Sequence, residues 1–294
     1  MYQIYRLSKK LVAAVLVTLT LILCAGILLG QPTTAADAPV AGESRQIPIV
    51  MYHGLLKESK RQGKYVISPD TFESDLKYLK EHGYTTVVMQ DLIDYVYDGK
   101  PLPEKPVVLS FDDGYYNNYT YAFPLLKQYN CKMVLAPIGK QTDNYSKTGE
   151  AHPNYSHVTW DNINEMMQSG LVEIQNHSYN MHQSTGNRVG TKKSKSETVE
   201  AYKRALTDDV MLMQQKVKEN TGYTPTTFVY PFGAVSDASK EILKEMGFVA
   251  TLSCESKISA ICQNSPDSLF MLGRYLRPAG ESSEVYFTKT LPLS

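Results

Sequence analysis

Two acidic residues stand where they could bind a metal ion and activate water. Asp112 and Asp113 follow the apolar run PVVLSF at residues 106–111 and precede Gly114. Neighbouring side chains on an ideal strand point to opposite faces, so the chain must turn here for both carboxylates to face one site. Two carboxylates this close stay ionised at neutral pH only if a cation or hydrogen-bond donors compensate. Because Asp-Asp-Gly turns are common at strand ends, this pattern alone does not define a site.

Two histidines form the second part of the pattern. His177 and His182 are five residues apart in the segment NHSYNMH, which follows the apolar run LVEIQ. The spacing differs from the i, i+4 pair of a helical zinc site, so the rings converge only if the intervening segment forms a loop. Two histidines and one carboxylate suit zinc, cobalt, nickel or iron and leave one position open. Two unrelated surface histidines are commoner, but the aspartates after another strand favour a metal site.

The elements that must position these residues alternate between strand and helix. The expected strands cover residues 47–52, 84–89, 106–111, 131–136, 171–175, 226–230, 248–253 and 269–276. The expected helices cover residues 68–82, 90–97, 121–129, 159–169, 197–220 and 236–246. This alternation predicts an α/β fold with a parallel sheet, and the number of units predicts a closed or nearly closed barrel. Two polar segments, 140–157 and 184–196, are expected to be solvated loops, or alternatively to border a groove.

The N-terminal residues differ in composition from the remainder. Three basic residues precede an uncharged apolar run over residues 11–30, which is long enough to span a bilayer as a helix. Residues 36–38 (ADA) nevertheless resemble a signal-cleavage site. We predict a signal anchor or signal peptide at 1–30, a linker at 31–45 and a catalytic domain at 46–294. The basic flank predicts that this domain lies outside the cell membrane, either anchored or secreted.

The charge and cysteine content limit the possible functions. The 294-residue chain has 30 Lys and Arg residues, 30 Asp and Glu residues and 43% hydrophobic residues, which excludes a disordered chain. It also gives no basic stripe for nucleic acid, and after residue 38 the balance is slightly acidic, with 27 basic and 29 acidic residues. Cys254 and Cys262 could form a local disulfide or remain free thiols. We expect a monomer.

These motifs together resemble the polysaccharide deacetylases of carbohydrate esterase family 4, which have the NodB-like fold. SFDDG at residues 110–114 matches the (T/S)FDDG of that family, and HSYNMH at 177–182 matches its His-(Ser/Thr)-x-x-His motif with one extra residue. That longer spacing is typical of the branch that includes poly-β-1,6-N-acetylglucosamine deacetylases. Further matching segments are PIVMYH at 48–53, TWD at 159–161, SGL at 169–171 and FVYPFG at 228–233. The resemblance spans residues 47–280 and implies a distorted (β/α) barrel.

The resemblance also implies a role for each residue. Asp113, His177 and His182 would ligate one divalent metal ion, with zinc as the first expectation and cobalt, nickel or iron as alternatives. Asp112 would be the general base for the attacking water. A backbone N–H near Phe232 would stabilise the oxyanion, and Tyr230 would lie beside the substrate. The implied reaction removes N-acetyl groups from an extracellular N-acetylglucosamine polysaccharide and releases acetate. The alternatives are peptidoglycan N-deacetylation or an O-acetyl (xylan-type) esterase activity at the same site.

The sequence departs from the common family pattern in two places. Val229 and Tyr230 stand where many members carry an arginine, and no histidine follows His182 to act as general acid. In the poly-N-acetylglucosamine branch the motif order is permuted, and the histidine of the early MYH segment, here His53, takes that role. A lone histidine at a strand end is more often a core residue. The lack of a later candidate favours His53, with the loop residues His152 and His157 as competitors.

Two other classes of protein fit the sequence less well. A glycan-binding module with a vestigial site would lack a ligand or the base, but all four of these residues are present. A retaining glycosidase needs two carboxyl groups about 5 Å apart across a sugar, which adjacent aspartates do not provide.

Overall fold

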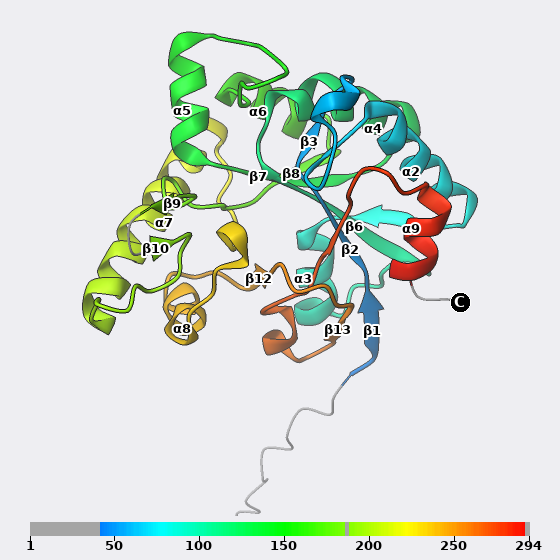
Figure 1. Ribbon diagram of the computed structural model, residues 1–294. Coiled ribbons are helices and arrows are strands. Elements are labelled where there is room, and N and C mark those ends of the chain that lie inside the picture. The colour runs from blue at the N-terminus through cyan, green and yellow to red at the C-terminus, as the bar shows by residue number, and fades with distance from the viewer. Residues whose placement is uncertain (1–41, 186–187, 292–294) are drawn as a thin grey trace, which may run out of the picture. The chain divides into compact units, whose positions relative to one another are not determined.

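The computed structural model describes residues 42–185 and 188–291, which form an α/β fold around a parallel sheet (Figure 1). The sheet order is β14-β2-β6-β7-β8, with β5 also paired to β6, and every one of these pairs is parallel. Its strands are β2 (Ile49–Tyr52), β5 (Thr85–Val87), β6 (Pro106–Asp113), β7 (Met133–Pro137), β8 (Val172–Ile174) and β14 (Tyr275–Leu276). The helix predicted within residues 1–30 lies outside the described residues. No helix in the described part of the chain is both long and apolar enough to cross a membrane.

A second parallel pair continues the sheet through single bridges. β11 (Thr227–Val229) pairs with β12 (Ala250–Leu252). Asn176, after β8, bridges to Phe228, and Leu252 bridges to Leu272, which precedes β14. The pairings therefore lead from β2 through β6, β7, β8, β11 and β12 to the segment of β14, which pairs with β2 again. The predicted strand 269–276 is shorter than expected because Met271 adopts a left-handed φ of 62°, which interrupts extended backbone.

Most helices cover the outer face of the sheet, α3 packs with its inner face, and six short strands form separate pairs. The helices are α2 (Pro69–Glu81), α3 (Met89–Asp98), α4 (Phe123–Tyr129), α5 (Gly139–Thr148), α6 (Trp160–Gln168), α7 (Val199–Thr221), α8 (Asp237–Glu245) and α9 (Ser283–Thr290). The remaining strands are β1 (Ser44–Ile47) with β13 (Ser259–Cys262), β3 (Gly54–Leu55) with β4 (Val66–Ile67), and β9 (Ser184–Thr185) with β10 (Arg188–Val189). Ser68 Oγ accepts the Thr71 N–H and Pro69 occupies the first helical position, which explains why α2 begins where predicted.

The buried apolar residues form three clusters that fix the orientation of the strands. The largest lies between the outer face of the sheet and α2, α4, α6, α7 and α9, and includes Val107, Leu109 and Phe111 of β6. A second lies on the inner face with α3 and β13, and includes Val108. A third packs α7 and α8 against β11. Alternate residues of β6 therefore face opposite clusters, as a strand buried on both faces requires.

Two segments predicted as solvated loops contain regular structure, so this prediction is wrong in part. Residues 140–157 contain most of α5, and residues 184–196 contain both strands of the β9–β10 pair. The sequence of α5 shows no apolar helical periodicity because the buried side of this helix carries polar side chains. Thr142 and Asp143 are buried, and Asp143 accepts a 2.8 Å hydrogen bond from Trp160 Nε1.

Cys254 and Cys262 are free thiols, which settles the open alternative between a disulfide and separate cysteines.

Candidate functional site

The candidate site lies on the inner face at the carboxyl ends of β2, β6 and β8. Ile49 of β2 and Val108 of β6 belong to the inner cluster, so His53 and Asp112, each an even number of residues later, fall on the same face. Val172 and Ile174 of β8 belong to the outer cluster, which places His177 on the inner face. Because parallel strands end at a common edge, the sheet brings these side chains together.

Asp113 adopts a left-handed backbone conformation, which allows the adjacent carboxylates of Asp112 and Asp113 to face the same site. Asp113 is the last residue of β6 and has a φ of 69°, which turns its side chain from the outer toward the inner face. Gly114 follows with a φ of 72°, and a Cβ there would meet Pro137 Cβ at 2.6 Å. A non-glycine residue in this conformation is strained by about 1–2 kcal/mol. The turn expected from the sequence is therefore present, and it starts one residue earlier than the glycine.

Asp113, His177 and His182 offer ligand atoms that all lie within 4.8 Å of one another. Asp113 Oδ1 is 3.1 Å from His182 Nε2 and 3.5 Å from His177 Nε2. Asp113 Oδ1 and His177 Nε2 are buried and have no hydrogen-bond partner among the described residues. Such separations suit atoms that share one cation at about 2.1 Å. The three residues therefore fit a divalent metal ion, which would satisfy both unpartnered atoms.

The neighbouring backbone orients His177 for this role. Its Nδ1–H donates to the Val229 carbonyl of β11 at 2.8 Å, so the lone pair of Nε2 points toward Asp113. This second contact fixes the tautomer, as is usual for histidine ligands of metals. Ser178, which follows His177, is also left-handed, with a φ of 69°, and starts the loop that leads to His182.

Asp112 is paired with a buried arginine that sequence reasoning missed. Arg274 Nη1 donates to Asp112 Oδ1 at 2.6 Å and to Ser110 Oγ at 2.9 Å, and both members of the ion pair are buried. Arg274 Nε donates to the Ser253 carbonyl at 2.8 Å. Arg274 lies in the segment before β14, so the partner of Asp112 comes from a distant part of the chain. Only a pattern linking two parts of the chain 162 residues apart could have revealed this pair.

The electrostatics of the site keep both carboxylates ionised. Burial raises the pKa of Asp112, but the charge of Arg274, with smaller contributions from His177 and His53, brings it below its usual value. Burial also raises the pKa of Asp113, but contact with His177 and the charges of His177 and His182 hold it well below its usual range. Asp112 can therefore accept a proton at neutral pH, and Asp113 can act as an anionic ligand.

His53 lies at the same centre, at the end of β2. Burial lowers the pKa of His53, whereas the negative charges of Asp112 and Asp113 raise it, and burial prevails. Its Nδ1 is buried without a hydrogen-bond partner among the described residues. The Tyr65 ring packs against the His53 ring with centroids 4.9 Å apart and is 49% exposed. His53 is thus placed beside the carboxylates rather than used in the core.

The residues predicted in the FVYPFG segment have different surroundings. Phe232 is left-handed with a φ of 57°, is 49% exposed and packs on His182 with ring centroids 4.2 Å apart. The N–H groups of Gly233 and Ala234 donate to backbone carbonyls, whereas no such bond is made by the Phe232 N–H within the described residues. Tyr230 is fully buried, and its hydroxyl lies 2.9 Å from Ser239 Oγ in the third cluster. The side chain of Tyr230 therefore packs in the core, and the role of Tyr230 at the substrate or oxyanion stays a prediction.

His157 and His152, the other two candidates for the general acid, are each held by local contacts. His157 is buried, and its Nδ1–H donates to the Asp113 carbonyl at 3.0 Å, which supports the left-handed turn. His152 stacks on Tyr155 in the loop after α5, and its Nδ1 accepts the Asn154 N–H at 3.2 Å. Both histidines therefore have local structural partners, which favours His53 as the acid candidate.

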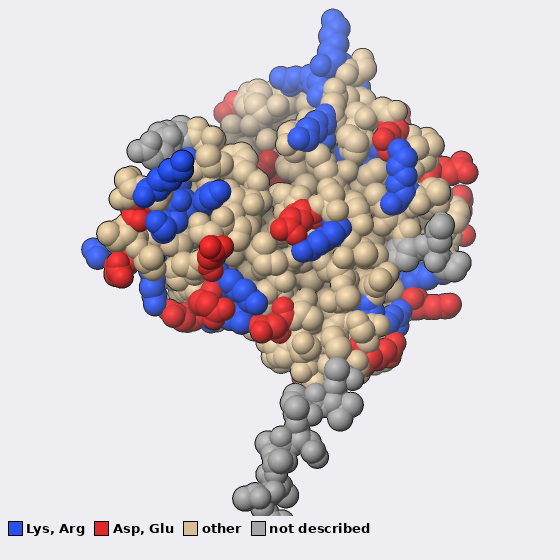
Figure 2. All heavy atoms as spheres, turned by 60° about the horizontal axis from the view of Figure 1, so that its bottom comes forward, with Lys and Arg blue, Asp and Glu red and all other residues tan. Residues whose placement is uncertain are grey.

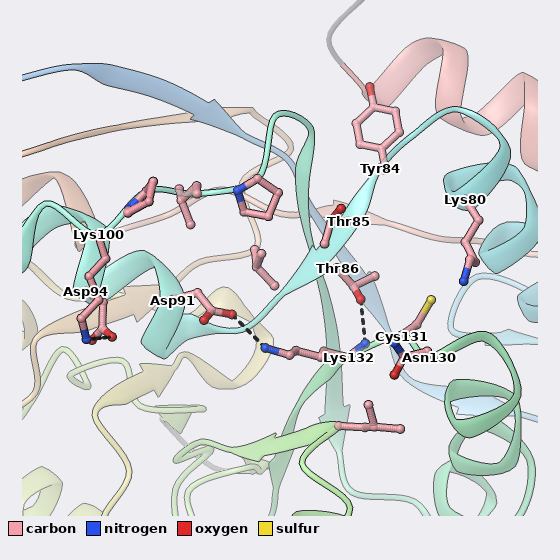
Figure 3. Close-up of a pocket in the computed structure, with 15 residues that line it drawn as sticks. Lys80, Tyr84, Thr85, Thr86, Asp91, Asp94, Lys100, Asn130, Cys131 and Lys132 are labelled. Carbon is pink, nitrogen blue, oxygen red and sulfur yellow. Dashed lines mark hydrogen bonds and ion pairs between the residues drawn. The ribbon is translucent and has the colours of Figure 1, made fainter.

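A separate cavity of about 490 Å³ lies at the opposite, amino ends of the strands (Figure 3). Its charged side chains are engaged locally. Lys132 Nζ is 3.5 Å from Asp91, and Lys100 Nζ is 2.6 Å from Asp94. Because α/β proteins build their active sites at the carboxyl ends of parallel strands, this cavity is not the candidate site.

The face drawn in Figure 2 mixes positive and negative side chains, without a continuous basic area among the described residues that it shows.

Fold and site together define an α/β protein with a candidate metal centre at the carboxyl ends of its parallel strands. The chain belongs to the polysaccharide deacetylase family, whose sequence model matches residues 99–251. It is 28% identical over 232 residues to the poly-β-1,6-N-acetyl-D-glucosamine N-deacetylase of Escherichia coli K12, covering 73% of this chain and 34% of that protein. It is 26% identical over 217 residues to the enzyme of the same name from Staphylococcus aureus MRSA252, covering 72% of this chain and 69% of that protein.

A solved structure shows the same fold. The de-N-acetylase from Aggregatibacter actinomycetemcomitans is 28% identical and superposes with a TM-score of 0.70, covering 83% of this chain and 100% of that one. The chain spans about a third of the length of the Escherichia coli relative, so its similarity concerns one part of that protein. These relatives confirm the resemblance first seen in the two motifs.

Proposed function

We propose that this protein is a metal-dependent hydrolase that removes N-acetyl groups from a polysaccharide containing N-acetylglucosamine. The observation that carries this proposal is the meeting of Asp113, His177 and His182 beside Asp112, an ionised carboxylate that is not needed as a ligand. The relatives named above support an N-linked acetyl group in a β-1,6-linked polymer as the first substrate to test. Peptidoglycan or an O-acetylated xylan remains the second choice.

Each residue of the site has a proposed task. A divalent ion, zinc by preference, would polarise the acetamide carbonyl and lower the pKa of a coordinated water. Asp112 takes the proton from the attacking water, while Arg274 holds the Asp112 carboxylate in place. The Phe232 N–H is available to the developing oxyanion, and His53 in its protonated form would deliver a proton to the leaving amine.

Two exposed aromatic rings give the centre a surface suited to sugars. Tyr65 packs against His53, and Phe232 packs against His182, and each ring is about half exposed. Side chains with an apolar ring can cover the apolar face of a pyranose, and tyrosine adds a polar tip. The left-handed conformation of Phe232 stores strain in order to present that ring, as is common at functional sites.

The sequence also supports proposals about the type of barrel, the domain boundaries and the cellular location of the protein. We propose that the ring of strand pairings is the distorted barrel of the NodB-like type. Residues 1–30 would hold a monomeric catalytic domain, 46–294, at the outer side of the membrane or direct its secretion. The apolar run at residues 11–30 supports this placement.

Acetate release tests the proposed function directly. The purified domain is incubated with β-1,6-linked N-acetylglucosamine oligomers, with chelator and then with zinc, cobalt, nickel or iron restored. We expect metal-dependent release of acetate without new reducing ends. A folded protein that releases no acetate from these oligomers, peptidoglycan or acetylated xylan with any of the metals would disprove it.

Replacing His53 by glutamine is expected to lower kcat by about 10²-fold, because the amide keeps the size of the side chain but cannot deliver a proton. Metal content per chain should be unchanged, since His53 is not among the three ligand residues. Steady-state kinetics and metal analysis of both proteins check this. Wild-type turnover in the variant would assign the acid role to another group.

Metal affinity is expected to fall with decreasing pH because of His177. Burial lowers the pKa of His177, but contact with Asp113 and the charges of Asp112 and Asp113 outweigh it, so the pKa is raised. In the metal-free protein His177 therefore keeps its proton to a higher pH than a free imidazole, and the metal must displace that proton. Competition with a coloured chelator should show affinity falling already near neutral pH. Constant affinity down to the range in which carboxylates titrate would contradict this assignment.

A further inference from the structure

The position of His182 needs an explanation that the sheet does not provide. His177 is anchored by β8 and by the carbonyl of Val229, but His182 follows a four-residue loop of irregular backbone, residues 178–181. A ligand on a loop is displaced easily unless other contacts fix that loop. The contacts of the loop's peptide groups therefore decide whether the metal centre is formed before a metal arrives.

One carboxylate of α7 binds two successive peptide groups of this loop. The Tyr179 N–H donates to Asp209 Oδ1 at 2.8 Å, and the Asn180 N–H donates to Asp209 Oδ2 at 2.9 Å. Asp209 is half-buried and is followed by the fully buried Val210, which holds α7 in the third cluster. Hydrogen bonds to an ionised acceptor are about twice as strong as neutral ones, so this pair is a firm attachment.

The opposite side of the loop is held by the start of α5. The N–H groups of Gly139 and Lys140 donate to the carbonyls of Ser178 and Tyr179 at 3.2 and 2.8 Å. Gly139 is required for this approach because a Cβ there would meet Tyr179 Cδ2 at 2.7 Å. The same Cβ would meet Met213 of α7 at 2.6 Å, so the loop is enclosed between α5 and α7, on one side of the sheet in Figure 1.

We propose that Asp209 is a positioning residue for the metal ligand His182. By fixing the backbone at Tyr179 and Asn180, the Asp209 carboxylate sets the path of the loop and holds the His182 imidazole at 3.1 Å from Asp113 before any metal binds. The hydrogen bonds of Asp209 go to the loop backbone and not to the three ligand side chains. The proposal rests on the proposed metal centre, and it assigns metal affinity to a residue 27 positions beyond that ligand.

The test compares Asp209→Asn with Asp208→Asn on the same helix. An asparagine keeps one acceptor but turns an NH₂ group toward the second peptide N–H, so one of the two attachments is lost. We expect Asp209→Asn to weaken zinc affinity by about tenfold, as loss of an outer partner of a ligand does. At saturating zinc kcat should return to within about twofold of wild type, because Asp209 does not touch reacting atoms. Asp208 is exposed, so Asp208→Asn removes the same charge and should bind zinc as wild type does.

Three results would overturn the proposal, and each is independent of substrate turnover. Wild-type zinc affinity in Asp209→Asn would remove the role, and an equal loss in Asp208→Asn would attribute the effect to helix charge. If Asp209→Asn does not fold, amide exchange of the metal-free wild-type protein decides the question. Protected amides at Tyr179 and Asn180 without metal support a preformed loop, whereas rapid exchange there contradicts it. Zinc binding is measured directly, so a failed deacetylase assay would not affect this outcome.

Discussion

Replacing Asp112 by asparagine is expected to lower kcat by up to about 10⁴-fold, the upper end of what a positioned general base contributes. The carboxylate is held ionised by Arg274 and is not one of the three ligand residues, so the variant should retain metal. The asparagine has nearly the same shape and can still accept the Arg274 hydrogen bond through its carbonyl oxygen. Single-turnover rates on an N-acetylglucosamine oligomer and metal content per chain measure the two effects separately.

The pattern of the two measurements decides the role of Asp112. Loss of turnover with full metal content identifies it as the base, and loss of both would mean that it supports the metal centre instead. Asp161→Asn is a matched control because Asp161 is an exposed acid in the first turn of α6, and this variant should behave as wild type. Turnover of Asp112→Asn close to wild type would assign proton abstraction to another group.

The motifs predicted most of this site because they are short and sit at strand ends. The spacing of Asp112 and Asp113 required a turn, and the left-handed φ at Asp113 is how the chain makes it. The loop needed between His177 and His182 is also present. Local sequence is informative here because period-two alternation along each strand determines which side chains share a face.

The residues that sequence reasoning missed act across long separations. Arg274 reaches Asp112 only because the segment before β14 returns to β2 and completes the ring of pairings. Asp209 lies in an amphipathic helix, where acidic residues on the polar face are common and do not indicate a function. The buried side of α5 carries polar side chains, so its sequence shows no apolar periodicity. Tyr230 was predicted at the site as a motif neighbour of Phe232, and strand alternation places its side chain in the third cluster.

The Arg274–Asp112 pair yields the prediction with the largest expected effect on stability. Replacing Arg274 by methionine keeps an unbranched side chain but leaves a buried carboxylate without its cation, because both residues are almost fully buried. Breaking such a pair costs about 3–5 kcal/mol of unfolding free energy. Urea denaturation of wild type and variant at neutral pH measures this loss. A change below about 0.5 kcal/mol, typical of a surface substitution, would contradict it.

The same variant should also shift the pH dependence of catalysis. Burial raises the pKa of Asp112 and Arg274 is the main group that lowers it, so removing the arginine must raise that pKa. A carboxylate that acts as a base works only when ionised, so with Asp112 in the proposed role the acid limb of kcat/KM is expected to move to higher pH in Arg274→Met. In the double variant Asp112→Asn, Arg274→Met no charge is left unpaired, so it should be more stable than Arg274→Met alone. A double variant that loses the sum of the two single effects would show that the two side chains are not energetically coupled, and Arg274 would then have only a structural role in the sheet.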